Sequence, residues 1–404
     1  MANKKIYNQI KPLSYVIGKV GSWIFSKFFL KLKVLRNDIP KKDGRRKVVI
    51  CNHESFYDFM AVITAIKGPM HMVTSSSMIR SLPICEMIKK FGVIDKNQFQ
   101  TLPSDMKKMK AVLDDGKMLV LFPAGVMPEG GYSTPIPSAT AKTLRWFNAD
   151  VYVANIRGTY LTKPKWSKIM RKGKTSIEIY KLASAEEFTS LSVEDADKLI
   201  GANLYFDAYK NNLQDKIKFK NGSNAEGLEN VVFKCPNCNK DYSIVSENQS
   251  ELRCVECGYS VKMDDMGVLH PNGDIPLVYS LVSDWHRFVE KSVFERVKNN
   301  ENFALKTEAD VYKINDKKHR FEKVGSATVI LDKENFEING KVNNEDFKKV
   351  IFAKNLPLLP SVPGKHFDIQ DGADIYRIYP KEPKIVIEWI LSLKAIYKLS
   401  HGLE

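Results

Sequence analysis

An apolar stripe with helical spacing opens the sequence. Its members recur three or four residues apart, which places them on one side of an α-helix, and they are Leu13, Ile17, Val20, Ile24, Phe28, Leu32 and Leu35. Most lysines of this segment lie off the stripe. The pattern predicts an amphipathic helix within residues 1–36. A basic amphipathic helix is typical of a membrane interface, but a surface helix that packs on the protein has the same pattern.

Short apolar runs alternate with helical patterns from about residue 46 to 182. The predicted strands are 47–51, 71–75, 117–122, 151–156 and 175–182. The predicted helices are 56–66, 78–90, 104–115 and 139–147, and a further amphipathic helix is predicted at 193–212. Strands that alternate with helices favour an α/β sheet with flanking helices, which we expect to occupy residues 37–218.

A different organisation is predicted for the second half of the chain. The polar, glycine-containing segment 219–230 predicts a linker, and a small cysteine-rich module at 231–263 follows it. Residues 264–404 contain a helical stretch near 276–298, β-rich segments between 303 and 380, and a closing helix at 385–399. This last region is similar to a β-rich PH/GRAM-like domain, a barrel capped by a C-terminal helix.

The net charge of +15 is concentrated at the N-terminus. Residues 1–47 contain 13 Lys and Arg residues but only two acidic residues. Because this charge lies along the predicted amphipathic helix, we expect an anionic membrane surface as partner and no nucleic acid. Lysines interrupt the most apolar stretch, residues 12–35, so no membrane-spanning helix is predicted.

The composition excludes several classes of protein. Hydrophobic residues make up 44% and charged residues 27%, a balance that suits a globular protein and not a disordered or collagen-like chain. Six cysteines are too few for a disulfide framework, and no signal-peptide pattern opens the sequence. We therefore expect a peripheral (monotopic) protein at the cytoplasmic face of a membrane.

The first candidate for chemistry directly follows a predicted strand. His53 stands five residues before Asp58. A carboxylate at one ring nitrogen orients an imidazole and stabilises its protonated form, and the other nitrogen can then take a proton from a hydroxyl. The same spacing recurs at His366 and Asp371, but no strand is predicted before that histidine. Because open α/β sheets bind ligands at the carboxyl ends of strands, His53 is the stronger candidate.

The second candidate is the Phe-Pro-Ala-Gly segment at residues 122–125, at the end of the predicted strand 117–122. A Pro-x-Gly turn at a strand end allows the backbone to approach a ligand closely, although such a turn is also common without any function. Both candidates leave a strand at its carboxyl end. We therefore expect them to meet at one edge of the sheet.

Together these segments resemble the glycerolipid acyltransferase family, typified by bacterial 1-acyl-sn-glycerol-3-phosphate acyltransferase. That family has Asn-His-x4-Asp, a Gly-x-apolar-x-Asp-Arg-like block, Phe-Pro-Glu-Gly and a later apolar strand. The matching segments here are 52–58, 92–96, 122–125 and 151–158, in the same order. The resemblance covers about residues 10–215 and implies an acyltransferase-like sheet.

The resemblance also implies roles for individual residues. His53 is expected to be the general base for the acceptor hydroxyl, which attacks an acyl thioester directly, and Asp58 to hold the imidazole. The residues expected to bind substrates are Asn52, Lys96, Phe122, Pro123, Gly125 and Arg157. The implied donor is acyl-CoA or acyl carrier protein, and the implied acceptor is a lysophospholipid such as 1-acylglycerol-3-phosphate.

The chain departs from the family in the loop after the Phe-Pro pair. Where the family has Phe-Pro-Glu-Gly-Thr-Arg, this chain has Ala124, Val126 and Met127 in place of the Glu, Thr and Arg. An Arg is well suited to bind a phosphate, so its loss leaves a less charged lyso-lipid or a glycolipid open as the acceptor. A non-catalytic zinc-ribbon protein that binds membranes or nucleic acid is the remaining alternative.

Two C-x-x-C pairs mark the third candidate site. Cys235 and Cys238 are followed, after fifteen residues, by Cys254 and Cys257. Four thiolates at this spacing are typical of a zinc ribbon with a closed tetrahedral Zn²⁺ site. We expect a structural zinc ion that folds a module too small to have a core of its own.

Overall fold

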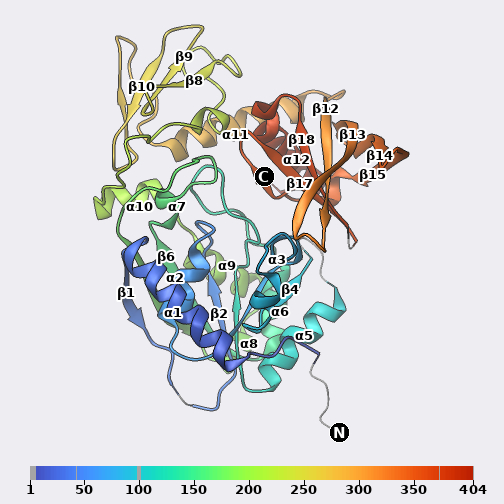
Figure 1. Ribbon diagram of the computed structural model, residues 1–404. Coiled ribbons are helices and arrows are strands. Elements are labelled where there is room, and N and C mark those ends of the chain that lie inside the picture. The colour runs from blue at the N-terminus through green and yellow to red at the C-terminus, as the bar shows by residue number, and fades with distance from the viewer. Residues whose placement is uncertain (1–5, 42, 98–101, 373, 404) are drawn as a thin grey trace. The chain divides into compact units, whose positions relative to one another are not determined.

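The chain divides into two compact units (Figure 1). The computed structural model describes residues 6–41, 43–97, 102–372 and 374–403. The first unit contains Met1–Pro164 and Met170–Lys220, and the second contains Lys165–Ile169 and Asn221–Glu404.

A seven-stranded sheet forms the centre of the first unit, in the order β1-β7-β6-β2-β5-β3-β4. Its strands are β1 (Leu32–Asn37), β2 (Lys47–Cys51), β3 (Met70–Ser75), β4 (Ile94–Lys96), β5 (Met118–Leu121), β6 (Asp150–Arg157) and β7 (Thr175–Ala183). β6, β2, β5, β3 and β4 run parallel to one another, whereas β7 and β1 run in the opposite direction. The carboxyl ends of the parallel strands therefore lie at one edge of the sheet.

Helices cover both faces of this sheet. They are α1 (Pro12–Phe28), α2 (Asp58–Ala65), α3 (Ser76–Arg80), α4 (Cys85–Lys89), α5 (Pro103–Asp114), α6 (Ala139–Phe147), α7 (Thr159–Thr162), α8 (Ala185–Ser190), α9 (Val193–Leu204) and α10 (Ala208–Asp215). Val48 and Ile50 of β2 belong to the core that includes Phe147 of α6. Val49, on the opposite face, belongs to the core that includes Val62 of α2. Because both faces are covered, every residue of β2 is buried and the strand is almost entirely apolar.

The predicted α/β sheet with flanking helices is confirmed for this unit. The strand at 47–51 and the helix at 139–147 have the predicted boundaries. The short edge strands β1 and β4 were not predicted.

The predicted N-terminal helix is wrong at its C-terminal end. α1 stops at Phe28, and Lys31 has a left-handed backbone conformation with a φ of 47°. Leu32 and Leu35 lie in β1, which pairs in parallel with β7. Hydrogen bonds to a strand far along the chain therefore decide the structure of these residues, although their spacing continues the helical stripe.

Two longer predicted helices are each divided in two. The predicted helix at 78–90 is replaced by α3 and α4, and Pro83 lies between them, where its ring cannot continue a helix. The predicted helix at 193–212 is replaced by α9 and α10. The Asp207 side chain accepts a hydrogen bond from the Lys210 N–H at 3.1 Å and so caps a new helix, α10.

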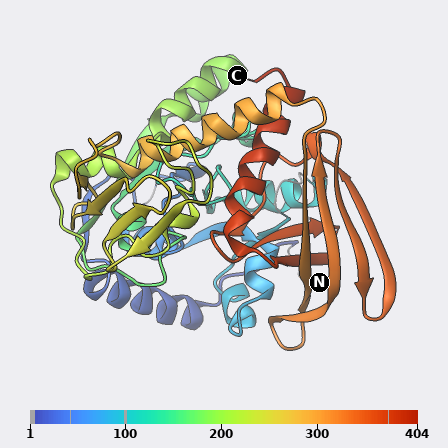
Figure 2. The same ribbon diagram turned by 90° about the horizontal axis from the view of Figure 1, so that it is seen from above.

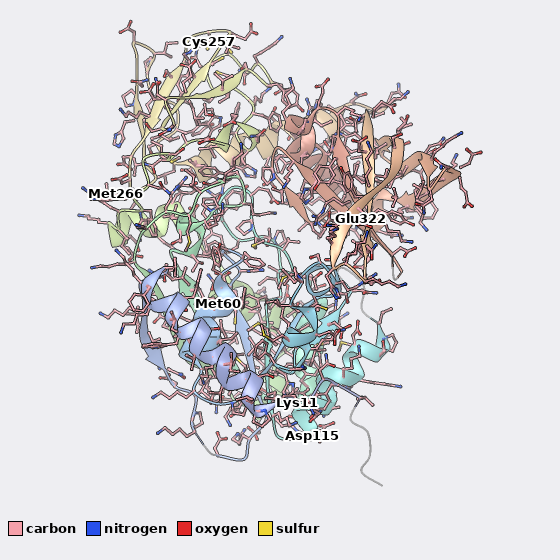
Figure 3. The ribbon with its side chains drawn as sticks, in the orientation of Figure 1. Lys11, Met60, Asp115, Cys257, Met266 and Glu322 are labelled. Atoms are coloured by element: carbon pink, nitrogen blue, oxygen red, sulfur yellow. The ribbon has the colours of Figure 1, made fainter. Side chains whose placement is uncertain are left out.

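α1 packs on the protein through its polar residues. Ser26 is buried and its hydroxyl donates to the carbonyl of Met60 in α2 at 3.2 Å (Met60 is labelled in Figure 3). Lys19 Nζ donates to the carbonyls of Ile66 and Lys67 at the end of α2, at 2.7 and 2.8 Å. The apolar stripe is the exposed side of the helix, with exposed fractions from 44% to 74% for Leu13, Ile17, Val20, Trp23, Ile24 and Phe28.

No helix in the described part of the chain is both long enough and apolar enough to cross a bilayer.

The predicted linker at 219–230 contains a boundary between the two units, which lies between Lys220 and Asn221. Its residues are packed, since Phe219 in the first unit and Ala225 and Leu228 in the second are each at most 2% exposed. The Phe219 ring lies so close to Gly173 that a Cβ added there would come within 2.0 Å of it. The polar composition of the segment did not indicate these few buried side chains.

Two antiparallel sheets make up most of the second unit. The 3₁₀ turn η1 (Leu228–Asn230) precedes the smaller sheet, which has the order β11-β10-β9-β8 and contains β8 (Ile244–Glu247), β9 (Glu251–Cys254), β10 (Ser260–Met263) and β11 (Leu269–Pro271). α11 (Val282–Asn299) follows it. The larger sheet has the order β15-β14-β13-β12-β18-β17-β16 and contains β12 (Ala304–Asn315), β13 (Arg320–Asp332), β14 (Asn335–Val342), β15 (Glu345–Phe352), β16 (Ser361–Val362), β17 (His366–Asp371) and β18 (Asp374–Pro380).

A long C-terminal helix packs on the larger sheet (Figure 2). In α12 (Val386–Ser400) the Trp389 ring lies 6.0 Å from Phe336 of β14 and 6.0 Å from Phe367 of β17. The 3₁₀ turns η2 (Ala353–Asn355) and η3 (Pro383–Ile385) complete the unit. The PH/GRAM-like assignment stays a prediction.

The core beneath α6 gives a test of this architecture. Phe147→Ala is expected to lower the free energy of unfolding by about 3–5 kcal/mol, because it leaves a cavity where a fully buried ring packs on the sheet. Trp146→Ala, at the neighbouring residue whose side chain is 49% exposed, is expected to cost less than about 1 kcal/mol. Urea unfolding followed by circular dichroism measures both. If both variants lost the same free energy of unfolding, the described orientation of α6 would be wrong.

Candidate active site

The predicted site residues of the first unit come from the ends of four strands, of which β6, β2 and β5 are neighbours and β4 lies two strands beyond β5. Asn52 and His53 directly follow β2, Phe122 directly follows β5, Arg157 ends β6 and Lys96 ends β4. These strands are parallel, so their carboxyl ends share one edge of the sheet. The expectation that the His53 and Phe122 segments meet there is fulfilled, since their rings lie 4.7 Å apart.

Asp58 is the most enclosed charged group of the site. Its side chain is fully buried at the first residue of α2. Oδ2 accepts hydrogen bonds from the backbone N–H groups of Glu54 and Ser55 at 2.7 and 2.9 Å, and it lies 2.8 Å from His53 Nδ1. Oδ1 accepts a hydrogen bond from the Thr159 hydroxyl at 2.5 Å. Backbone donors and a helix N-terminus both stabilise a carboxylate, so Asp58 is well suited to stay ionised.

His53 is held through one ring nitrogen, and its side chain is partly exposed. Nδ1–H donates to Asp58, which leaves Nε2 with a lone pair. The side chain is 21% exposed and lines a small hollow together with Cys51, Asn52, Ala124, Ser133, Thr134, Ile136, Leu204 and Phe206. The ring can therefore accept a proton from a group that enters this hollow.

Asn52 is a structural clamp. Its side-chain Oδ1 accepts a hydrogen bond from the Ile156 N–H at 2.7 Å, and its Nδ2 donates to the Ile156 carbonyl at 2.8 Å. These bonds join the end of β2 to β6 and fix the point at which His53 leaves the sheet. The predicted substrate contact of Asn52 stays a prediction, and these two hydrogen bonds give the residue a positioning role.

The Phe-Pro-Ala-Gly segment forms a tight turn beside His53. The Gly125 N–H donates to the Phe122 carbonyl at 3.0 Å, and Gly125 has a φ of 70°, a conformation that favours glycine. Pro123 lies within this turn, and Val126 after it is buried. The turn thus places a phenyl ring against the imidazole and a small residue, Ala124, in the hollow.

A comparison with known protein families identifies the segment that contains these residues. Residues 33–156 match the family model described as Acyltransferase. The first unit carries an acyltransferase domain. Among solved structures, the 1-acyl-sn-glycerophosphate (LPA) acyltransferase PlsC from Thermotoga maritima is similar at 18% identity, over 48% of this chain and 76% of that chain, with a TM-score of 0.39. No curated protein sequence matches the chain.

The matched segment contains His53, Asp58 and the Phe-Pro turn. The predicted resemblance to an acyltransferase family is therefore confirmed for residues 33–156. His366, the other histidine five residues before an aspartate, lies inside β17 and is 4% exposed. That position is unlike the accessible strand end at which the acyltransferase domain presents His53.

The two predicted cations flank the site on opposite sides. Arg157 ends β6, which is adjacent to β2, and its guanidinium lies 3.7 Å from the Asp215 carboxylate of α10. Lys96 ends β4, three strands from β2, which is about 14 Å at ordinary strand spacing. Its Nζ donates to the Asn97 carbonyl at 3.2 Å, and partial burial lowers the pKa of the amine. Arg157 therefore lies nearer to His53 across the sheet, although it already has an acidic partner.

Sequence reasoning missed a second buried acid and the residues that hold it. Glu54 is 1% exposed, and its Oε2 accepts a hydrogen bond from the Tyr160 N–H at 3.1 Å and lies 3.2 Å from the Thr159 hydroxyl. Thr159 and Tyr160 begin α7, whose N-cap Gly158 has a φ of 87°. A Cβ at Gly158 would lie 3.0 Å from the Lys174 carbonyl, so the chain turns here at a glycine. The sequence signal for this turn was a glycine followed by a threonine at the end of a predicted strand, Gly158 and Thr159.

The four predicted metal ligands come together in the second unit. One Sγ atom from each of Cys235, Cys238, Cys254 and Cys257 lies within 4.8 Å of the others. Cys235 Sγ lies 3.7 Å from Cys257 Sγ, and Cys238 Sγ lies 3.7 Å from Cys254 Sγ. All four cysteines are free thiols, and Cys257 is labelled in Figure 3. The four-cysteine cluster is thus a feature of the fold.

Proposed function

We propose that this protein moves a fatty acyl group from acyl-CoA or acyl carrier protein to the free hydroxyl of a lysophospholipid, in phospholipid synthesis. The observation that carries the proposal is the His53–Asp58 pair at the edge of the sheet, with the Phe-Pro turn beside it. The match to the acyltransferase family supports the same reaction class. The acceptor we propose is 1-acylglycerol-3-phosphate.

The geometry suits a direct transfer assisted by a general base. Asp58 accepts a hydrogen bond from Nδ1–H, so His53 Nε2 can accept the proton of the acceptor hydroxyl. The hydroxyl oxygen attacks the thioester carbon, the C–S bond breaks, and the leaving thiolate takes the proton from the imidazolium. The buried charge of Asp58 stabilises that imidazolium in between.

A covalent cysteine intermediate has no support in this site. Cys51 lines the same hollow, but burial and the nearby Asp58 carboxylate raise the pKa of its thiol well above the ordinary value. A thiol of this kind is a poor nucleophile because the thiolate is the reactive form.

The exposed apolar side of α1 supports a peripheral position on a membrane. Its exposed aliphatic and aromatic residues form one stripe, and Lys27 lies over the Trp23 ring at 4.9 Å. Phe25 of the same helix lies 5.0 Å from Tyr57, in the turn that connects His53 to α2. A helix that lies in the bilayer interface would therefore bring the turn next to His53 close to lipid substrates. We place this surface at the cytoplasmic face of an anionic membrane.

The charges at the sheet edge support an anionic head group. Lys96 and Arg157 lie on either side of the catalytic pair, and a lysine can bind phosphate as a point charge. The loop residue that would be Arg in the family is Met127, which is half-buried here. A less charged lyso-lipid or glycolipid is the competing acceptor, and the activity assay below distinguishes the two.

The four-cysteine cluster suits a structural Zn²⁺. A tetrahedral site with Zn–S bonds of about 2.3 Å requires sulfur atoms about 3.8 Å apart, close to the two separations of 3.7 Å. Four thiolates leave no open position for catalysis. The module is tied to α11 of its own unit, since Trp285 Nε1 donates to the Lys234 carbonyl at 2.8 Å and Arg296 pairs with Asp241 at 3.0 Å. When bound, zinc would hold the two C-x-x-C turns together beside that helix.

His53→Ala is expected to lower acyl transfer by at least about 10³-fold, because the general base is removed. The matched control is His270→Ala, which removes an exposed histidine 3.0 Å from Asp264 and is expected to leave activity unchanged. The assay supplies lysophosphatidate, a lysophosphodiester and a glycolipid acceptor with acyl-CoA. Wild-type turnover retained in His53→Ala would exclude the proposed mechanism, and a strong preference for an uncharged acceptor would exclude lysophosphatidate.

Replacing the exposed stripe of α1 is expected to weaken binding to anionic liposomes. The triple variant Ile17→Ser, Val20→Ser and Ile24→Ser should lower the partition coefficient about tenfold or more, since three apolar side chains no longer enter the interface. Leu213→Ser, at a 46% exposed residue of α10, is the control. Substitutions are preferred to truncation because residues beyond Phe28 build β1. Unchanged partition of the triple variant in liposome sedimentation would show that the stripe does not bind lipid.

The protein is expected to contain one Zn²⁺ per chain. Cys238→Ser should lower the zinc content severalfold, because one of four ligands is lost, whereas Cys85→Ser in the first unit should leave it at one. Elemental analysis of protein purified without chelators measures both. A zinc content near zero in the wild type would refute the site. If removal of zinc abolished acyl transfer and left the structure unchanged, the structural role would be refuted.

A further inference from the structure

A second carboxyl group lies beside the catalytic pair and is shielded from water. Glu54 is 1% exposed, and it follows His53 directly in the chain. Its Oε2 accepts the Tyr160 N–H at 3.1 Å. Its Oε1 is buried and has no hydrogen-bond partner among the residues that the structure describes. A buried carboxylate normally needs a donor at each oxygen, so this environment suits the neutral acid better.

One hydroxyl group lies between the two acids. The Thr159 oxygen is 2.5 Å from Asp58 Oδ1 and 3.2 Å from Glu54 Oε2. A hydroxyl has one hydrogen, and the shorter distance shows that it points to Asp58. Asp58 then has four donors, namely His53, Thr159 and two backbone N–H groups. Glu54 has far less support for a negative charge, so a proton shared by the two acids belongs on Glu54.

We propose that Glu54 is a positioning residue that acts as a neutral carboxylic acid, donating its hydrogen to Thr159 so that the threonine hydrogen is aimed at Asp58. Glu54 Oε2–H donates to Thr159 Oγ1, and Thr159 Oγ1–H donates to Asp58 Oδ1. These two hydrogen bonds hold the Asp58 carboxylate, which orients His53. Asp58 is then the only one of the two acids that carries a negative charge. The proposal rests on the proposed acyl-transfer function for its kinetic consequence only.

The electrostatics of the site agree with a neutral Glu54. Burial, together with the Asp58 charge, raises the pKa of Glu54 to about 8, while hydrogen bonds from α7, first that of the Tyr160 N–H, act in the opposite direction. The charged group that acts on Glu54 is Asp58, and α7 contributes only uncharged donors. Above about pH 8 Glu54 becomes ionised, and two carboxylates then compete for the one threonine hydrogen.

Ionisation of Glu54 has a predictable effect on the base. An ionised Glu54 no longer donates a hydrogen to Thr159, so the threonine hydrogen is no longer held toward Asp58 Oδ1. Asp58 then loses one of its four donors, and its hold on His53 becomes weaker. Wild-type acyl transfer is therefore expected to fall as the pH rises from 8 to 9. A variant that cannot ionise at this position should not show that fall.

Infrared spectroscopy tests the neutral acid without any need for activity. Folded wild-type protein at pH 7 should show the carbonyl stretch of a protonated carboxyl group that is lost in Glu54→Gln and that disappears in the wild type with a midpoint near pH 8. Glu194→Gln, at an exposed glutamate of α9, should leave this band unchanged. If the wild type and Glu54→Gln have identical spectra at pH 7, Glu54 is ionised and the proposal is wrong, whatever the protein catalyses.

Kinetics test the positioning role. Glu54→Gln keeps an N–H donor for Thr159 and should lower kcat about threefold at pH 7, whereas Glu54→Leu keeps no donor and should lower it about thirtyfold, with KM unchanged in both. At pH 9 the kcat of Glu54→Gln should equal or exceed that of the wild type, because the activity of the variant does not fall between pH 8 and pH 9. Parallel pH profiles for the wild type and Glu54→Gln, or equal losses for the Gln and Leu variants, would overturn the role.

Discussion

A buried carboxylate with no buried cation beside it has to be supported by hydrogen bonds, and this requirement organises the active edge of the first unit. Asp58 lies at the start of α2, where two backbone N–H groups of the preceding turn point at Oδ2. The same oxygen orients His53, and the other oxygen accepts the hydroxyl of Thr159. One side chain thus joins the segment after β2 to the segment after β6. The parallel arrangement of β2 and β6 is what places both segments at the same edge.

The hydrogen bonds that hold Asp58 and His53 come from outside the loop in which this chain differs from the family. The Phe-Pro turn contributes a ring against His53 and a glycine with positive φ, and neither depends on the residue types at positions 124, 126 and 127. Asn52 clamps β2 to β6 independently of that loop. Substitutions in the loop therefore leave the hydrogen bonds of the His53–Asp58 pair in place. α1 adds a division of roles, since Lys19 and Ser26 bind the protein and the apolar stripe faces outward.

Much of this site could be predicted from local sequence because its parts are short and contiguous. His53 and Asp58 are five residues apart, the turn at 122–125 follows an apolar strand, and the four cysteines have the spacing of two metal-binding turns. The end of α1 could not be predicted, because Leu32 and Leu35 continue the helical spacing but pair with β7. Glu54 and Thr159 were missed for a related reason. Their meeting depends on the parallel pairing of strands that are far apart in the chain.

The central claim is that an acceptor hydroxyl, activated at the end of β2, attacks an acyl thioester without a covalent intermediate. Mass spectrometry of the products from purified full-length protein, given mixed lyso-lipids and an isotopically labelled acyl-CoA, tests it most directly. The account predicts one labelled diacyl lipid for each free CoA, and no labelled acyl group on the protein after rapid quenching. Release of free fatty acid alone, or a labelled acyl-protein that decays into product, would contradict it.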